Sequence, residues 1–254
     1  MHLLIDLGNT RLKWAAVSPD ATSTRGAFAH EGARVADALT REWAALPPVQ
    51  GVFVASVAHA ALDEEIDALV RSRFGIGAEF LRSPAFALGI RNAYGEPHRL
   101  GIDRFLGLAT LHATQPRAQV LVGVGTAMTL DALDVDGVHL GGWIVPSPAL
   151  MRDAVLARTA RVGVADGAVV DFAGNTADAL HSGSLYAASG AVERFCANAA
   201  RRLMTWPAVV LTGGGADEIA PLMPGAERQT DLVLRGLQLW ASAAQSPEFA
   251  RGSQ

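Results

Sequence analysis

The tetrapeptide Gly101-Ile102-Asp103-Arg104 places a carboxylate and a guanidinium at the expected start of a helix. Phosphoryl transfer to an alcohol needs a base near the attacking hydroxyl and a cation for the charge of the substrate. The dipole at a helix N-terminus stabilises an ionised Asp103, and Arg104 offers a planar fork for a carboxylate. Because Asp is also a favoured N-cap residue, the tetrapeptide alone leaves a catalytic and a purely structural interpretation open.

The first glycine turn of the chain, Gly8-Asn9-Thr10, follows an acid, Asp6, that comes directly after an apolar run. A strand that delivers a carboxylate into a glycine turn can hold Mg²⁺ while backbone N–H groups meet phosphate oxygens. Lys13, the only lysine of the chain, adds a positive charge beside this turn. The competing interpretation is an ordinary hairpin turn with a solvent-facing lysine, and this segment does not decide between the two.

Two further glycine turns lie in the second half of the sequence. Gly125-Thr126-Ala127 follows an apolar strand, and Thr126 can present a hydroxyl and an N–H group to a phosphate. The glycines of Thr212-Gly213-Gly214-Gly215 let a flat ring or a ribose lie against the backbone. The turn at Gly125 does not match a dinucleotide fingerprint, because Met128 stands where the third glycine should be, and Lys13 has no Walker A loop around it. Each is a plain connection when taken alone, but three such turns together predict a nucleotide held between two lobes.

The composition excludes several other classes of protein. The chain of 254 residues is 50% hydrophobic and 18% charged, which predicts a soluble globular protein with a sizeable core. Its formal net charge of −4 argues against nucleic acid as the main partner, and its histidine spacing argues against zinc. The sequence has a single cysteine, Cys196, no signal-peptide pattern and no run suited to crossing a bilayer. We therefore expect a cytoplasmic protein without membrane contact.

The apolar periodicity predicts an α/β protein. Strands are expected at 3–5, 12–17, 51–57, 78–81, 120–122, 128–133 and 208–211, with a further hairpin that ends at 141–146. Helices are expected at 31–46, 62–74, 104–113, 147–157, 176–204 and 230–244, with a loop-rich segment at 83–102 and a frayed tail at 246–254. The repeat of strand, glycine turn and returning strand indicates an internal duplication, with lobes at 1–115 and 116–254.

These segments, in this order, resemble the type III pantothenate kinases over residues 3–240. The matching pieces are Asp6 to Lys13, Tyr94-Gly95, Gly101 to Arg104, Gly125 to Asp131, Gly141 to Pro146, Asn175-Thr176 and Thr212 to Gly214. Each piece is common by itself, whereas the ordered set is specific to that family.

The resemblance implies an actin-like, RNase H-related ATPase fold, in which a nucleotide cleft lies between two duplicated lobes, and it implies a homodimer. It implies phosphorylation of the primary hydroxyl of pantothenate by ATP with Mg²⁺, the first step of coenzyme A synthesis. The N-terminal lobe would carry the phosphate loop and the substrate site. The C-terminal lobe would carry the second phosphate turn and the glycine loop on the adenosine side.

The resemblance also assigns roles to individual residues by position. Asp103 is the implied general base. The implied ATP-binding residues are Asp6, Leu7, Gly8, Asn9, Thr10, Arg11, Leu12, Lys13 and Thr126, with Asp6 as a candidate ligand of Mg²⁺. The implied pantothenate-binding residues are Tyr94, Gly101, Ile102, Asp103, Arg104 and, from the neighbouring subunit, Thr176.

The sequence departs from the family pattern at two positions. Many relatives carry an aspartate that helps to bind a monovalent cation where this chain has Gly123, so we expect weak or absent dependence on potassium. The family's G-G-x-I-x-P-G segment ends here in Ser147 instead of glycine. Two other functions stay open: an actin-like kinase for another small alcohol, and a catalytically silent accessory or regulatory protein with the same fold.

Overall fold

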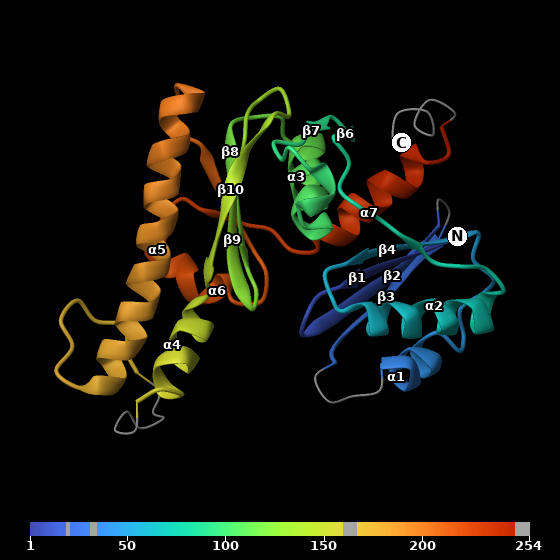
Figure 1. Ribbon diagram of the computed structural model, residues 1–254, viewed down its shortest axis with the longest axis horizontal. Helices are drawn as coiled ribbons and strands as arrows, with labels where there is room; N and C mark the ends of the chain where they lie inside the picture. The colour runs from blue at the N-terminus through green and yellow to red at the C-terminus, as the bar shows by residue number, and fades with distance from the viewer. Residues whose placement is uncertain (19–20, 31–34, 160–166, 247–254) are drawn as a thin grey trace. The chain divides into compact units, whose positions relative to one another are not determined.

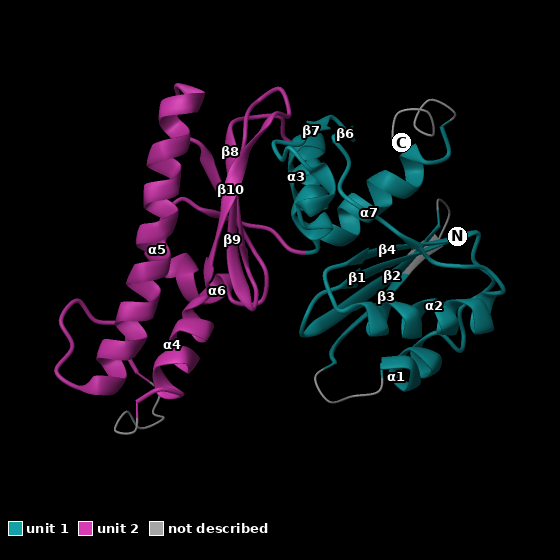
Figure 2. Ribbon diagram, in the orientation of Figure 1, with its two compact units in different colours: residues 1–114, 231–254 teal, residues 115–230 magenta. Residues whose placement is uncertain are grey.

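The structure, a computed structural model, describes residues 1–18, 21–30, 35–159 and 167–246. The chain divides into two compact units, which Figure 2 shows in different colours. Unit 1 comprises Met1–Thr114 together with the segment that begins at Asp231, and unit 2 comprises Gln115–Thr230. Each unit contains one five-stranded sheet of mixed direction.

Unit 1 is built on the sheet β3-β2-β1-β4-β5, in which β1 pairs antiparallel with β2 and parallel with β4. Its elements are β1 (His2–Leu7), β2 (Arg11–Ser18), β3 (Ala21–Ala29), α1 (Val35–Glu42), β4 (Gly51–Ser56), α2 (Ala60–Phe74) and β5 (Glu79–Phe80). Because successive side chains of a strand alternate between faces, Leu3, Ile5 and Leu7 pack on one side, in the core formed with α1 and α2. Figure 1 shows these two helices against that face. Asp6 therefore points to the opposite face.

The opposite face of this sheet is covered by α7 (Leu232–Ala243), which contacts β1, β2 and β4. α7 also packs on α3 (Ile102–Thr114). The two helices approach closely, because a Cβ atom on Gly236 would lie 2.5 Å from Leu106 O. This packing places the start of α3, the start of α7 and the end of β1 in the same unit.

The loop-rich segment between β5 and α3 contains short regular elements that the sequence did not predict. They are the two-stranded hairpin of β6 (Phe86–Ala87) and β7 (Ile90–Arg91), followed by a 3₁₀ helix at Pro97–Arg99. The remainder of 83–101 is irregular, as expected.

Unit 2 repeats the plan of unit 1 with the sheet β10-β9-β8-β11-β12. Its elements are β8 (Gln119–Val124), β9 (Ala127–Leu133), β10 (His139–Pro146), α4 (Pro148–Leu156), α5 (Thr176–Leu203), β11 (Ala208–Thr212), α6 (Ala216–Ile219), a 3₁₀ helix (Ala220–Leu222) and β12 (Glu227–Arg228). β8 pairs antiparallel with β9 and parallel with β11, as β1 does with β2 and β4. The long helix α5 lies along one face of this sheet (Figure 1), where Leu185 and Val192 join a core with Val122.

Most of the expected strands and helices are confirmed, with ends that differ by two residues or fewer. The helix expected at 31–46 ends earlier, at Glu42, and its first residues, 31–34, lie outside the described residues. The tail expected at 246–254 falls, beyond residue 246, outside them too. The edge strand β3 was not predicted, because its described side chains alternate only between exposed and half-buried and no apolar run marks it. Among the described residues, no helix has both the length and the apolar character needed to cross a membrane.

The observed division differs from the expected lobes 1–115 and 116–254 in one respect. The segment that begins at Asp231 groups with residues 1–114 instead of with the second lobe. The reason is the packing of α7 on the first sheet and on α3, to which Thr110 Oγ1 adds a hydrogen bond donated to Leu232 O at 2.8 Å.

Candidate active site

The first glycine turn joins β1 to β2. Gly8 N donates a hydrogen bond to Arg11 O at 3.0 Å, and a Cβ atom on Gly8 would lie only 3.2 Å from that same oxygen. His30 holds the turn by two hydrogen bonds. Its Nε2 donates to Gly8 O at 2.8 Å, and its backbone N donates to Thr10 O at 3.1 Å. Sequence reasoning missed His30, which directly follows the unpredicted strand β3.

Asp6, the next-to-last residue of β1, lies opposite Lys13 on β2 and beside Ala55 on β4. It keeps some contact with solvent, yet its pKa is raised to about 7. Burial of the carboxylate is the largest cause, and the negative charge of Asp103 comes second. Lys13 opposes the shift, and Asp231 adds to it. Asp6 and Asp103, which are far apart in the sequence, are thus close enough in unit 1 to interact through their charges.

Lys13 forms an ion pair with Asp231, whose Oδ1 lies 3.0 Å from Lys13 Nζ. Arg25 approaches the other oxygen of the same carboxylate, at 3.6 Å. Asp231 immediately precedes α7 in a left-handed backbone conformation, with φ of 56°, and its side chain makes no capping hydrogen bond. Sequence reasoning missed Asp231, because only the packing of α7 on the first sheet brings it to Lys13.

Asp103 lies in the first turn of α3, two positions further into the helix than expected. We expected Asp103 to precede a helix at 104–113, but the helix begins at Ile102, and Gly101 O accepts the first hydrogen bond, from Phe105 N at 3.1 Å. A Cβ atom on Gly101 would lie 2.5 Å from Asp103 Oδ1, so this position must be small for the carboxylate to lie where it does. The helix N-terminus still stabilises a negative charge at this place.

Arg104 is buried, and its Nη1 donates a hydrogen bond to Tyr94 Oη at 3.1 Å. Its guanidinium carbon lies 5.8 Å from the centre of the Tyr94 ring. The loop that presents Tyr94 is organised by Asn92, whose Oδ1 accepts from Tyr94 N at 3.0 Å. Asn92 Nδ2 also donates to Pro84 O and Pro97 O, at 3.1 and 3.0 Å, so one amide ties this loop together.

Ile102, the remaining residue expected to contact pantothenate in this segment, points its side chain into the core, where it is 4% exposed. Any contact that it makes with a substrate must therefore come from its backbone. The four residues that carry side-chain chemistry here, Asp6, Lys13, Asp103 and Arg104, all belong to unit 1.

The second glycine turn joins β8 to β9 in unit 2. Gly125 N donates to Ala127 O at 2.9 Å, and the exposed Thr126 lies at the tip. Ser147 Oγ donates to Thr126 O at 2.9 Å, which connects this turn to the start of α4.

The third glycine turn packs directly on the second. Gly215 N donates to Val124 O at 3.0 Å. Gly213 has φ of 93°, and a Cβ atom there would overlap the Val124 carbonyl, so only glycine fits. The structure thus brings together two turns of unit 2 that lie far apart in the sequence.

Gly123 occupies the same place in β8 that Asp6 occupies in β1, one residue before the strand ends. A Cβ atom on Gly123 would lie 2.9 Å from Thr129 Oγ1, so the threonine hydroxyl occupies the space that a side chain at position 123 would need.

Asp131, the last residue of the motif that begins at Gly125, does not lie at the second glycine turn. It is fully buried, and its Oδ1 is 2.9 Å from His139 Nε2. Thr176 is the exposed first residue of α5, and the N-cap Asn175 accepts from Asp178 N at 2.9 Å.

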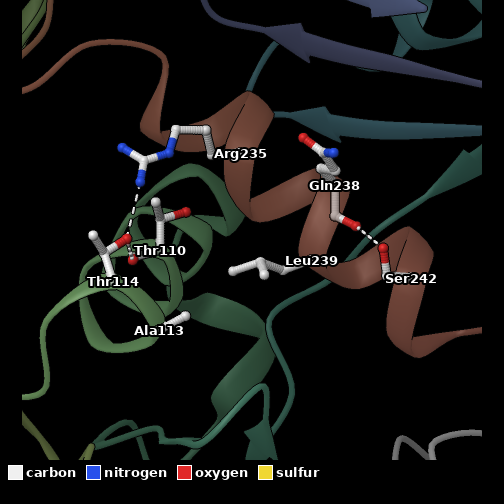
Figure 3. Close-up of a pocket in the computed structure, with 7 residues that line it drawn as sticks. All are labelled: Thr110, Ala113, Thr114, Arg235, Gln238, Leu239 and Ser242. Carbon is white, nitrogen blue, oxygen red and sulfur yellow. Dashed lines mark hydrogen bonds between the residues drawn. The ribbon is translucent and has the colours of Figure 1, made fainter. Parts of the chain in front are cut away.

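An open pocket of about 270 Å³ lies between α3 and α7 (Figure 3). Arg235 Nη2 donates to Thr114 Oγ1 at 2.9 Å on one side of it, and Ser242 Oγ donates to Gln238 O at 2.9 Å. None of the residues assigned to ATP or pantothenate is among those that line it, so this pocket is not part of the candidate active site.

The described residues contain no group of three or more His, Cys, Asp or Glu side chains placed to hold a metal ion by themselves. Mg²⁺ in nucleotide sites is usually held by one or two carboxylates together with substrate phosphates and water. Asp6 suits that role, since a desolvated carboxylate next to the charge of Asp103 gains from a nearby cation.

Two mixed sheets of identical topology, each with a glycine turn between its first two strands, define the two-lobed α/β fold of the actin-like ATPases and kinases. The fold is similar to that of a protein from Campylobacter jejuni described as a Baf family transcriptional activator, with a TM-score of 0.64 and 19% identity over 96% of this chain and 100% of that one. A protein from Sinorhizobium meliloti described as a 2-dehydro-3-deoxygalactonokinase has a TM-score of 0.58 and 14% identity, over 96% of this chain and 99% of that one. These two likenesses concern the fold alone.

The sequence comparisons identify the family. Residues 2–198 match the family model of the type III pantothenate kinases. A type III pantothenate kinase of Xanthomonas oryzae pv. oryzae is 42% identical over 244 residues, which cover 96% of this chain and 98% of that protein. The chain therefore belongs to the type III pantothenate kinase family, and the resemblance drawn from its motifs is confirmed.

Proposed function

We propose that this protein transfers the γ-phosphoryl group of ATP to the primary hydroxyl of pantothenate, giving 4′-phosphopantothenate in the first step of coenzyme A synthesis. Membership of the type III pantothenate kinase family supports the substrate and the reaction. The observation that carries the site assignment is the closeness of Asp103 to Asp6 within unit 1. In this arrangement Asp103 is suited to accept a proton, and Asp6 is suited to bind a cation that accompanies the phosphates.

Asp103 is the general base in this proposal. Its carboxylate accepts the proton of the substrate hydroxyl as the hydroxyl oxygen forms a bond to the γ-phosphorus. The bond between the γ-phosphorus and the bridging oxygen breaks at the same stage, and ADP leaves. The small Gly101 and the N-terminus of α3 support this role, because they give the carboxylate space and stabilise its charge.

The remaining assigned residues bind and orient the two substrates. Residues 6–13 and Thr126 bind the phosphates of ATP, with Lys13 as the positive charge and Asp6 as the ligand of Mg²⁺. When bound, Mg²⁺ neutralises charge that develops on the phosphate oxygens. Arg104, held by Tyr94, binds the carboxylate of pantothenate, and Gly101 and Ile102 line the same site through their backbone.

We also propose a cytoplasmic homodimer in which Thr176 reaches the active site of the partner subunit. Unit 2 exposes apolar side chains on the edge strand β10 and on α5: Ile144 is 64% exposed and Tyr186 is 41% exposed. Exposed apolar surface of this kind favours a protein interface, and most homo-oligomers are symmetric dimers. Thr176 begins α5, the helix that carries part of this surface.

Subunit complementation tests the dimer. Asp103→Asn and Thr176→Ala each inactivate both sites of their own dimer. In a mixed dimer, one site combines an intact Asp103 with an intact Thr176 if Thr176 acts in the partner, so random mixing restores about a quarter of the sites. Mixing that restores no activity would place Thr176 in its own subunit's site or outside any site.

A coupled assay of ADP formation across several alcohols tests the reaction. We expect ADP formation that depends on pantothenate, with a phosphorylated product identified by mass spectrometry. ADP formation with a different alcohol alone would favour the alternative of another actin-like kinase. Binding of ATP without turnover on any alcohol would favour a catalytically silent accessory or regulatory protein.

A further inference from the structure

Ser147 connects the second glycine turn to the following helix through one buried hydroxyl group. The residue is 2% exposed and lies between the end of β10 and the start of α4. Its Oγ donates to Thr126 O at 2.9 Å and accepts from Leu150 N at 3.2 Å. The same oxygen therefore caps α4 and holds the turn that carries Thr126.

The hydrogen bond from Ser147 to Thr126 adds one more link between the two chain segments after the backbone pairing of β9 with β10 has ended. The β9–β10 ladder ends at the pair of Ala127 and Pro146, and proline has no N–H group to donate. Thr126 O, one residue further along, is held by the side chain of Ser147 instead of by a backbone N–H of the next residue. Because the peptide unit is planar, fixing this carbonyl fixes the orientation of the whole peptide at the tip of the turn.

We propose that Ser147 is a positioning residue for the phosphates of the nucleotide: it holds Thr126 and its turn in the orientation that binds them. The inference rests on the proposed role of Thr126 in binding ATP, and it concerns a position at which this chain departs from the glycine of the family pattern. Ser147 itself touches no reacting atom. It acts through the carbonyl of Thr126.

Three substitutions separate the bond to the turn from the cap of α4. Ser147→Ala removes both. Ser147→Gly removes the donor to Thr126 O but costs the helix start little, because glycine is a tolerated N-cap residue. Ser147→Thr keeps the hydroxyl and both bonds. We expect the Ala and Gly variants to raise the KM for ATP by about 5- to 10-fold, the scale of one lost hydrogen bond, with the Thr variant within about twofold.

Two further readouts and one control variant separate positioning from a general loss of stability. The KM for pantothenate should change by less than about twofold in all three variants, because Ser147 acts on the nucleotide side. The melting temperature should fall in Ser147→Ala more than in Ser147→Gly. Asp134→Ala is the matched control: Asp134 Oδ1 accepts from Asp136 N and Val138 N, at 2.9 and 2.7 Å, in the turn at the other end of β9. It should lower the melting temperature and leave the KM for ATP unchanged.

Binding of ATP alone, measured by calorimetry, keeps the inference testable if pantothenate is not the substrate. A wild-type protein without pantothenate-dependent turnover would overturn the proposed function and leave the Ser147 comparison intact. The inference predicts weaker ATP binding in both Ser147→Ala and Ser147→Gly. An unchanged dissociation constant for ATP in Ser147→Gly would overturn it, since the hydroxyl would then serve only to cap α4.

Discussion

The two glycine hairpins share a backbone plan and differ in chemistry. In the first, the residue one place before the strand end is Asp6, which lies opposite Lys13. In the second, the same place holds Gly123, which lies opposite Thr129. The first hairpin is surrounded by charges, and the second is held by the neutral hydroxyl of Ser147. The repeated fold fixes where a turn lies, and the side chains around the turn decide whether charge or hydrogen bonding dominates there.

Loss of the carboxylate at the start of α3 should have the largest effect of any change near the charged hairpin. Asp103→Asn should lower turnover by roughly two to four orders of magnitude, the usual scale for removing a general base, with ATP binding largely kept. Asp37→Asn is the matched control, because Asp37 also lies in the first turn of a helix of unit 1 and is exposed. Near-normal turnover of Asp103→Asn would remove Asp103 from its proposed role.

Arg104→Ala should mainly weaken the binding of pantothenate. We expect the KM for pantothenate to rise by about 10- to 100-fold, since a charge-assisted contact to a carboxylate is lost. Tyr94→Phe, which removes only the phenol oxygen that accepts from Arg104, should give a smaller rise. Arg99→Ala is the control, because Arg99 is an exposed arginine of the same loop, paired with Glu96 at 2.9 Å. An unchanged KM in Arg104→Ala, with the protein folded, would reject the assignment.

Asp6→Asn should stabilise the protein at alkaline pH. The pKa of Asp6 is raised in the folded state to about 7 from 3.8, so the folded state holds a proton that the unfolded state releases. Asp6 therefore costs no stability below pH 3.8, and the cost grows as the pH rises from 3.8 to about 7, above which it is fully present. We expect the melting temperature of Asp6→Asn to exceed that of the wild type by about 2 to 8 °C at pH 8 and to match it near pH 4.

Asp67 provides a comparison for the melting-temperature measurement, because its pKa is shifted in the opposite direction from that of Asp6. Its pKa is lowered, first by the hydrogen bond from Ala78 N and then by the hydrogen bond from Arg71. Asp67 therefore stabilises the fold above its ordinary pKa of 3.8, and this contribution is lost as the pH falls. Asp67→Asn should lower the melting temperature at neutral pH, and the difference should shrink in acid. If the change in melting temperature relative to the wild type had the same sign and the same pH dependence in Asp6→Asn and Asp67→Asn, the electrostatic account of Asp6 would be contradicted.

Potassium should have the smallest effect, because the neutral hairpin has glycine where many relatives have a cation-binding aspartate. Replacing Na⁺ by K⁺ at fixed ionic strength should change turnover by less than about twofold. The hydroxyl of Thr129 fills the space next to Gly123, which leaves little room for an additional ligand. Strong activation by K⁺ over Na⁺ would show that other oxygens replace the aspartate.

The elements with buried apolar runs were predictable from the sequence, and so were the glycine turns between them. β1, whose Leu3, Leu4 and Ile5 are almost fully buried, is an example. β3 was not predictable, because an exposed edge strand leaves no apolar pattern. The sheet to which α7 belongs could not be predicted either, since an apolar helix face does not specify which of two similar sheets it covers.

The candidate site could be proposed from the sequence where neighbouring residues carry the chemistry, as with Asp103 and Gly101, and the role of Asp103 stays a prediction. It was not predictable where contacts join distant segments. Asp231 reaches Lys13 only through the packing of α7, and His30 reaches Gly8 only through β3. Ser147 stood out in the sequence as a departure from a family pattern, but its bond to Thr126 is visible only in the folded chain.

A crystal structure with ADP, Mg²⁺ and pantothenate bound tests the central claim most directly. The account predicts phosphate groups against the turns at Gly8 and Gly125, and the primary hydroxyl of pantothenate within hydrogen-bond distance of the Asp103 carboxylate, about 2.6 to 3.2 Å. A pantothenate hydroxyl bound far from Asp103, or phosphates bound away from both glycine turns, would contradict it.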